Sequence, residues 1–240
     1  MSQASVPAGR RSAAVSRWWV ARPAVIGVAI ALPCVLGFVE LAEDFRVSPR
    51  SARLDAAGTA AVQSWRSPPL TAFFIGVTTL ADSLTVWLVA AAVVIGLLLL
   101  RRWSSAVLVF LAVAFGSLFG SVVKIRFARA RPPLESMLIA QPYGYSFPSG
   151  HALAGVELYG VLAFLIFREL RRAWQKAVVV VVAVCLAMLI GVSRVYLGAH
   201  WPSDVFASWL LGGAWLALLC GAYVSWERAT RPRGSSVAEL

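Results

Sequence analysis

Long apolar runs separated by short polar segments make up most of this chain. Six of the runs are close to the roughly 20 residues that a helix needs to cross the hydrocarbon of a bilayer. They lie at 23–42, 83–100, 104–123, 151–167, 177–192 and 205–226. The pattern therefore predicts an all-α integral membrane protein with six transmembrane helices.

Two further segments lie between the first and the second of these runs. Residues 70–81 are apolar but short, and two prolines, Pro68 and Pro69, precede them. We expect a short interfacial or re-entrant helix here, which leads into the second span. Residues 43–65 mix polar and apolar positions, which is typical of a helix that lies on a membrane surface.

The composition agrees with a membrane protein that has one folded unit. Of the 240 residues, 60% are hydrophobic and 14% are charged, and the mean hydropathy is +0.77. Soluble domains have a lower apolar share and a higher charged share. Because the loops are short, we expect a single membrane domain at 23–226, between an N-terminal tail at 1–22 and a C-terminal tail at 227–240. The first apolar run has no small-residue cleavage site, so it predicts an anchor and no removable signal peptide.

The distribution of the basic residues predicts the orientation of the helices. With six spans both termini share one side, and thirteen of the 22 Lys and Arg residues lie in the tails and two loops of that side. Positive residues favour cytoplasmic loops, so we expect a multi-pass membrane protein with both termini in the cytoplasm. Five other cations break this rule and are expected on the extracytoplasmic side: Lys124, Arg126, Arg129, Arg131 and Arg194. This distribution favours an anionic substrate or lipid over nucleic acid as the partner.

The first group of these cations lies in the segment KIRFARARP, residues 124–132. If the third helix continues through it, Lys124 and Arg131 are two turns apart and project from the same face. The point charge of a lysine and the planar fork of an arginine suit a phosphate group. An alternative is that these cations only contact lipid headgroups at the end of a helix.

The second segment is FPSGH, residues 147–151, at the start of the fourth predicted helix. Ser149 is a favoured N-cap residue, and Gly150 lets the backbone approach a ligand. The first N–H groups of a helix attract an anion. His151 lies in this first turn and could give a proton to a bound group, although a solvated interfacial histidine would look the same.

The third segment is SRVYLGAHWPSD, residues 193–204. Arg194 lies at the end of the fifth predicted helix, and Pro202 suits the first turn of the sixth. Asp204 follows His200 by four residues, so its carboxylate can hydrogen-bond one imidazole nitrogen and leave the other free. A histidine oriented in this way is a candidate nucleophile or base. The alternative is an aspartate that only caps the helix.

Together the three segments resemble the signature of the type 2 phosphatidic acid phosphatase superfamily: K-x6-R-P, P-S-G-H and S-R-x5-H-x3-D. They match it position for position and in order between residues 124 and 204, and the six spans extend the likeness to most of the chain. The resemblance implies a membrane lipid phosphatase, similar to bacterial undecaprenyl-diphosphatases and phosphatidylglycerophosphatases B. Such enzymes act outside the cytoplasmic leaflet, without a metal or another cofactor.

The resemblance also implies a role for each signature residue. His200 would attack phosphorus and become phosphohistidine, Asp204 would orient it, and His151 would protonate the departing oxygen. The phosphate-binding residues would be Lys124, Arg131, Ser149, Gly150 and Arg194. Water would then release phosphate from His200. Arg126 and Arg129 are not signature positions, and the resemblance implies no role for them.

The substrate is expected to be a lipid phosphomonoester or diphosphate, and the extra arginines favour the diphosphate of an undecaprenyl-type polyprenyl carrier. Phosphatidylglycerophosphate and phosphatidic acid are the alternatives. Membrane lipids are the other expected partners, with no obligate protein partner evident.

Two other classes of protein remain open at the level of the sequence. One is an intramembrane serine protease with Ser149 as the nucleophile. The other is a non-enzymatic lipid-binding or transport protein, for which the acidic residues Glu40, Asp82 and Glu157 could be cited; we expect these three to have structural roles.

Overall fold

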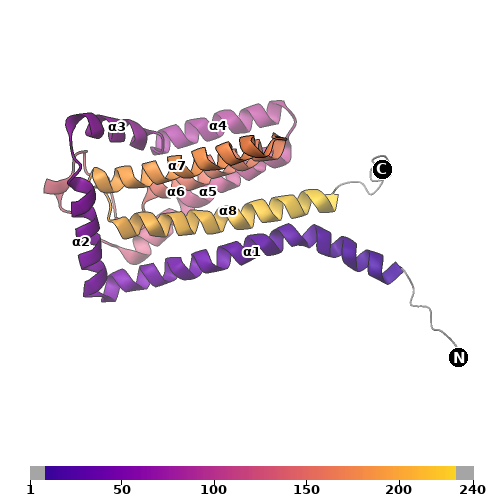
Figure 1. Ribbon diagram of the computed structural model, residues 1–240, viewed down its shortest axis with the longest axis horizontal. Coiled ribbons are helices and arrows are strands. Elements are labelled where there is room, and N and C mark those ends of the chain that lie inside the picture. Colours follow the sequence, from indigo (N-terminus) through magenta and orange to yellow (C-terminus); the bar gives the residue numbers. More distant parts are fainter. Residues whose placement is uncertain (1–8, 231–240) are drawn as a thin grey trace.

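The computed structural model describes residues 9–230, which form an elongated bundle of helices (Figure 1). The α-helices are α1 (Gly9–Val47), α2 (Pro49–Gln63), α3 (Pro68–Thr79), α4 (Ser83–Leu99), α5 (Trp103–Phe127), α6 (Gly150–Glu169), α7 (Ala173–Tyr196) and α8 (Pro202–Thr230). A short 3-10 helix, η1 (Leu134–Ser136), lies in the connection between α5 and α6. The all-α membrane fold predicted from the apolar runs is therefore confirmed.

Five of the described helices, α1 and α5 to α8, are long and apolar enough to cross a membrane. The pair α3 and α4 passes the same test as one unit that is bent by 47° at a short break. Residues 70–81, expected as an interfacial or re-entrant helix, thus fall mainly in α3, the first half of a broken span. Phe74, Val77 and Thr78 of α3 are buried, and the helix packs against α7. The six predicted spans correspond to these five helices and this pair.

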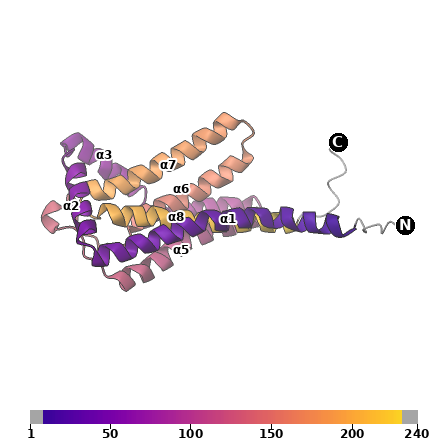
Figure 2. The same cartoon turned by 60° about the horizontal axis from the view of Figure 1, so that its bottom comes forward.

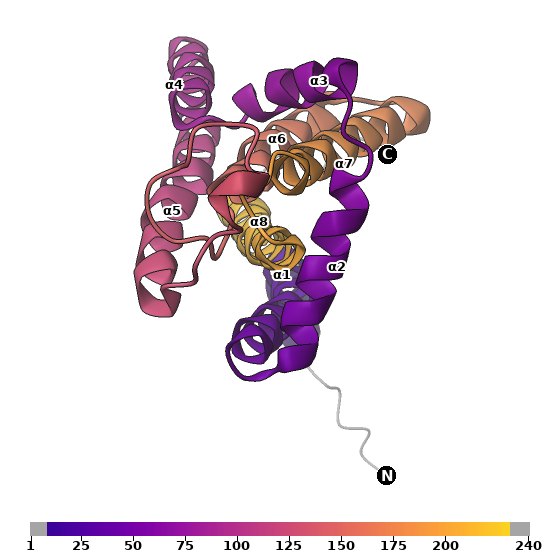
Figure 3. The same ribbon diagram turned by 90° about the vertical axis from the view of Figure 1, so that its left-hand side faces the viewer.

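The helix α2 runs across one end of the bundle instead of along it (Figures 1 and 3). The connection between α5 and α6 and the short connection between α7 and α8 lie at the same end (Figure 3). All three sequence motifs therefore meet at this end of the molecule. The start of α1 and the end of α8 lie at the opposite end (Figure 1).

Helices α1 and α8 pack along each other over much of their length (Figure 2). Two glycines allow their backbones to approach closely. A Cβ atom on Gly27 would lie 2.4 Å from the carbonyl oxygen of Ala217, and one on Gly221 would lie 2.6 Å from that of Pro23. Small residues are a common means of close helix packing in membranes.

An aromatic cluster anchors the connection between α5 and α6. Phe147 is fully buried, and its ring centroid lies 4.7 Å from that of Phe45, 5.2 Å from that of Phe127 and 5.6 Å from that of Phe38. This cluster joins the loop to the ends of α1 and α5. It thereby fixes the backbone that enters the P-S-G-H motif directly after it.

The helices extend beyond most of the predicted apolar runs. The last two helices, for example, begin at Ala173 and Pro202, ahead of the predicted starts at 177 and 205. The extensions are more polar than the runs, so hydropathy alone does not mark them. Residues 1–8 and 231–240 of the two predicted tails lie outside the described residues.

Candidate active site

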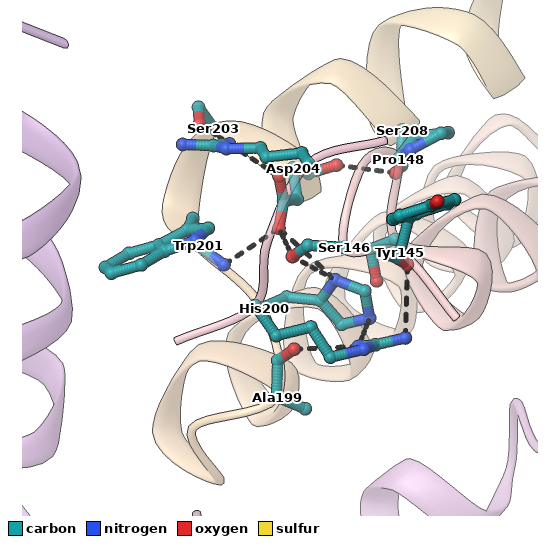
Figure 4. A network of polar contacts seen from close by, with 12 residues as sticks. Tyr145, Ser146, Pro148, Ala199, His200, Trp201, Ser203, Asp204 and Ser208 are labelled. Atoms are coloured by element: carbon teal, nitrogen blue, oxygen red, sulfur yellow. Dashed lines mark hydrogen bonds and ion pairs between the residues drawn. The ribbon is translucent and has the colours of Figure 1, made fainter. Parts of the chain in front are cut away.

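The pair His200 and Asp204 lies at the junction of α7 and α8, and both side chains are buried (Figure 4). The Nδ1 atom of His200 lies 3.3 Å from Oδ2 of Asp204. The same carboxylate oxygen accepts a 3.0 Å hydrogen bond from the backbone N–H of Trp201 and a short one from the hydroxyl of Ser146. Asp204 therefore both caps the start of α8 and contacts the histidine, so the two roles considered from the sequence are combined.

The other ring nitrogen of His200 faces a guanidinium group. Nη1 of Arg131 lies 3.2 Å from Nε2 of His200 and also donates to the carbonyl oxygen of Ala199 at 2.9 Å. Because arginine stays protonated and has no acceptor, Nε2 must accept this hydrogen bond. The proton of the neutral ring then lies on Nδ1, where it points to Asp204. Nε2 is left with a lone pair that faces a cation.

Burial and charge keep this ring uncharged. Burial lowers the pKa of His200 to about 3; the nearby cations Arg194 and Lys124 lower it further, while Asp204 opposes the shift. The sign is that expected for a base moved out of water, because the charged form loses its hydration. His200 is thus a neutral imidazole near pH 7.

Lys124 lies in the last turn of α5 and donates to the carbonyl oxygens of Tyr145, at 2.9 Å, and Pro148, at 2.7 Å. The expectation that α5 continues to Arg131 is wrong. The helix ends at Phe127, and Ala128 takes a left-handed conformation with φ of 46°. Arg131 instead lies in the following loop and reaches the same carbonyl of Tyr145 at 3.2 Å. The two cations converge, but through a folded loop and not through one helix face.

The second motif starts α6 as its sequence predicted. Ser149 has an extended backbone, and its hydroxyl oxygen accepts the N–H of Ala152 at 3.4 Å, so it is the N-cap. The N–H of Ser149 donates to the backbone carbonyl of Asp204 at 3.2 Å, which joins the start of α6 to the third motif. Gly150 follows as the first helical residue, where the N–H groups have no partner within the helix.

His151 follows in this first turn and pairs with a residue that the motifs do not contain. Its Nε2 lies 2.7 Å from Oδ1 of Asp82, the residue that precedes α4. This contact holds the ring and leaves Nδ1 for another partner. Asp82, for which we expected a structural role, thus contacts a candidate site residue.

Arg194 is almost fully buried in the last turn of α7. Its Nη1 donates to the hydroxyl of Thr78 in α3 at 2.7 Å, whereas its Nε has no hydrogen-bond partner among the described residues. A buried, unpaired donor on a cation is costly unless a ligand satisfies it. Arg194 is therefore suited to bind an anion.

A cavity of about 340 Å³ lies between α4, α5 and α6, and Lys124, Gly150 and His151 are part of its lining. Glu157 lines it as well. One of its carboxylate oxygens would lie 1.8 Å from a Cβ at position 116, so a larger residue there would displace the carboxylate, and the other oxygen has no partner within the described part of the chain. Glu40, by contrast, is exposed on α1.

Three residues around the site were not assigned to it from the sequence: Asp55 of α2, and Arg129 and Ser146 of the connection between α5 and α6. Arg129 donates to Asp204 and to Asp55, each at 2.5 Å. Its partners are 75 and 74 residues away along the chain. Nothing local in the sequence indicates such pairs, because they depend on how the helices pack.

The sequence of this chain is similar to those of known membrane phosphatases. The model of the PAP2 superfamily matches residues 105–228. Phosphatidylglycerophosphatase B of Bacillus subtilis is 30% identical over 148 residues, which cover 61% of this chain and 72% of that protein. Undecaprenyl-diphosphatase of Sulfolobus acidocaldarius is 33% identical over 132 residues, or 52% of this chain and 59% of that protein.

The fold has a solved counterpart. The crystal structure of a transmembrane PAP2-type phosphatidylglycerolphosphate phosphatase from Bacillus subtilis matches this chain with a TM-score of 0.76 and 27% sequence identity. The match covers 85% of this chain and 98% of that one. The family match includes all three motifs and more than half of the residues, so the chain belongs to the PAP2 superfamily, as the motifs predicted.

Proposed function

We propose that this PAP2-superfamily phosphatase hydrolyses a membrane lipid phosphomonoester or diphosphate through a phosphohistidine formed on His200. The observation that carries the proposal is the neutral, buried imidazole whose Nδ1 faces Asp204 and whose Nε2 faces the guanidinium of Arg131. That arrangement places a lone pair of a nucleophile beside a cation that binds phosphate oxygens.

In the first step, the lone pair on Nε2 of His200 attacks phosphorus, and the bond from phosphorus to the lipid oxygen breaks. The lipid oxygen leaves with a proton from His151, which Asp82 orients. As the P–N bond forms, positive charge develops on the ring of His200, and the carboxylate of Asp204 stabilises it through the Nδ1 hydrogen bond. The products of this step are the lipid alcohol, or the lipid monophosphate from a diphosphate, and phosphohistidine.

In the second step, water attacks phosphorus, gives a proton to His151 and releases inorganic phosphate, which restores neutral His200. Lys124, Arg131 and Arg194, together with Ser149 and the N–H of Gly150, stabilise the charge on the phosphate oxygens in both steps. These donors supply the neutralisation that a metal ion supplies in other phosphatases, so we propose a reaction without a metal.

The proposed orientation places the site on the extracytoplasmic side of a bacterial plasma membrane. The basic loops at Arg101 and Arg102 and at 168–176 lie at the opposite end of the bundle, as do the start of α1 and the end of α8 (Figure 1). Basic loops favour the cytoplasm. Both termini would then be cytoplasmic, and lipids of the outer leaflet would reach the site at headgroup level.

The proposed substrate remains the diphosphate of a polyprenyl carrier, with phosphatidylglycerophosphate and phosphatidic acid as alternatives. The names of the two relatives support both kinds of lipid. The two extra arginines favour a diphosphate less than the sequence suggested. Arg129 is engaged by two carboxylates, and Arg126 is exposed beside the ring of Phe127. The cavity beside Lys124 and His151 would hold the part of the lipid next to its phosphate.

The function is tested by phosphate release from the purified protein in detergent. We expect rapid release from at least one of four lipids: polyprenyl diphosphate, polyprenyl monophosphate, phosphatidylglycerophosphate and phosphatidic acid. The rate should be unchanged by EDTA and inhibited by vanadate, which resembles the transition state of phosphoryl transfer. Loss of activity with EDTA would contradict a metal-free reaction, and no release from any lipid would favour a binding or transport protein.

The contact between Asp82 and His151 gives a second prediction, which concerns the leaving group. Asp82→Asn should slow the hydrolysis of a lipid phosphate about 10- to 100-fold, because an alkoxide leaves poorly without a proton from an oriented acid. Release from an aryl phosphate with an activated leaving group should change far less, since that group leaves without a proton. The pair of rates is measured for Asp82→Asn and for Glu40→Gln, an exposed carboxylate used as the control. If Asp82→Asn lowers the rate equally with both substrates, Asp82 does not assist the transfer of the proton to the leaving group.

A serine protease is not supported by the position of Ser149. Its hydroxyl oxygen accepts the N–H of Ala152, and the motif that contains it belongs to the PAP2 family match. Serine-directed reagents should therefore leave the phosphatase activity intact.

A further inference from the structure

Arg129 lies at the centre of a buried ionic network beside the site. Its Nη1 donates to Oδ1 of Asp204 at 2.5 Å and to the hydroxyl of Ser203 at 2.7 Å. Its Nη2 donates to Oδ2 of Asp55 at 2.5 Å. The carboxylate of Asp55 also accepts the N–H of Ser203 at 2.9 Å and its hydroxyl at 2.6 Å, so α2 holds the first turn of α8 from outside that helix.

The guanidinium of Arg129 also lies close to two aromatic rings. It lies 4.4 Å from the ring centroid of Phe45 in α1 and 5.8 Å from that of Trp201. Its side chain is 11% exposed, and those of Asp55 and Asp204 are 6% and 0% exposed. A buried guanidinium with two carboxylates and two aromatic faces is fixed in one orientation.

The two carboxylate oxygens of Asp204 have different partners. Oδ2 receives the N–H of Trp201, the hydroxyl of Ser146 and the Nδ1 contact of His200, while Oδ1 pairs with Arg129. A fully buried carboxylate is stable as an anion only when it is paired and hydrogen-bonded. Arg129 supplies the charge in this pairing, and Asp55 in turn anchors Arg129.

We propose that Arg129 is a positioning residue, held by Asp55 of α2, which keeps Asp204 ionised and directed at His200 and so sets the reactivity of the nucleophile. The proposal rests on the function proposed above and extends it to two residues that are not signature positions, Arg129 within the first motif and Asp55 outside all three. It also gives α2 a role, because this helix, which crosses the end of the bundle, becomes part of the support for the catalytic pair.

The charge of Arg129 also affects the pKa of His200. The charged groups around His200 are Asp204 of α8, Arg131 of the loop, Arg194 of α7 and Lys124 of α5. Without Arg129, the negative charge of Asp204 and Asp55 is no longer compensated, so protonated His200 is favoured and its pKa rises. His200 must be neutral to attack phosphorus. The acid limb of the rate profile, which is the pH range in which the rate falls as His200 becomes protonated, should therefore move to higher pH by about one unit.

The first test compares Arg129→Gln with Arg126→Gln, a matched change at an exposed arginine three positions earlier in the same motif. We expect kcat for the fastest lipid substrate to fall about 100-fold in Arg129→Gln, with KM changed less than about threefold and the acid limb moved upward. Arg126→Gln should behave as wild type. Arg129→Lys keeps the charge but loses the fork, so it should recover about 10-fold of the lost turnover and restore the position of the acid limb.

Asp55→Asn separates this role from a purely structural one. This variant removes a negative charge, which disfavours protonated His200. The acid limb of its rate profile should therefore lie at the same pH as in wild type or at a lower pH, even if turnover falls. Thermal melting in the same detergent gives the folded fraction of each variant, and Arg129→Lys and Asp55→Asn decide the question if Arg129→Gln does not fold. The inference is overturned if an active wild type and Arg129→Gln have the same kcat and the same dependence of rate on pH. It is also overturned if Asp55→Asn moves the acid limb to higher pH, as Arg129→Gln is expected to do. A wild type that releases no phosphate contradicts the proposed function instead.

Discussion

His200→Ala is expected to lower phosphate release by about 10⁵-fold or more, because it removes the protein atom proposed to bond to phosphorus. Among the described residues, no other side-chain nucleophile contacts both Asp204, as Nδ1 of His200 does, and Arg131, as its Nε2 does. The rate of release from the best lipid substrate measures the effect, against the background of uncatalysed hydrolysis.

The control for His200→Ala is the integrity of the folded protein. The side chain is buried, so the variant is compared with wild type by size-exclusion profile and thermal melting in detergent. A folded variant that keeps more than a small fraction of its turnover would contradict nucleophilic catalysis by His200. It would favour another chemistry at the same anion site.

Asp204→Asn has the second largest expected effect, a loss of roughly 10² to 10⁴ in turnover. Its carboxylate receives hydrogen bonds from Arg129, Ser146 and Trp201 and faces Nδ1 of His200. All of these partners present a proton. An amide cannot satisfy them, because its NH₂ group meets a donor in either orientation. The histidine then loses the contact that directs its proton to Nδ1 and stabilises its positive charge.

The measurement for Asp204→Asn is kcat and KM with the same lipid substrate. We expect kcat to fall while KM changes little, because the ion pair acts on the nucleophile and not on the substrate. Asp44→Asn, at an exposed carboxylate of α1, is the control for the general loss of a negative charge. Near-normal turnover in folded Asp204→Asn would exclude Asp204 from the mechanism.

Features that depend on neighbouring residues could be predicted from the sequence. Ser149 caps α6, as its residue type and position indicated. His200 and Asp204 contact each other because four positions across a helix start bring their side chains together. The apolar runs predicted the number of spans, since a helix in a bilayer must satisfy its own backbone and expose apolar side chains.

Features that depend on the path of loops and on helix packing could not be predicted in this way. The end of α5 at Phe127 was missed because the third predicted helix was taken to continue through the first motif as far as Arg131. Ala128 gives no local signal for its left-handed conformation. The contacts of Asp82 with His151 and of Asp55 with Arg129 join residues 69 and 74 positions apart. A charged residue near an apolar run indicates that it has a partner, but only the packed bundle shows which one.

Formation of a phosphohistidine on His200 can be observed by trapping the phosphorylated protein. Wild-type protein is mixed with the lipid substrate that the panel ranks first, labelled with ³²P at its terminal phosphate, and the reaction is stopped in alkali, in which phosphohistidine survives. If His200 is the nucleophile, wild-type protein is labelled, the label is lost in acid and is located at His200 by mass spectrometry, and His200→Ala is not labelled. Rapid turnover of the lipid without any labelled wild-type protein, or a label on a residue other than His200, would contradict it.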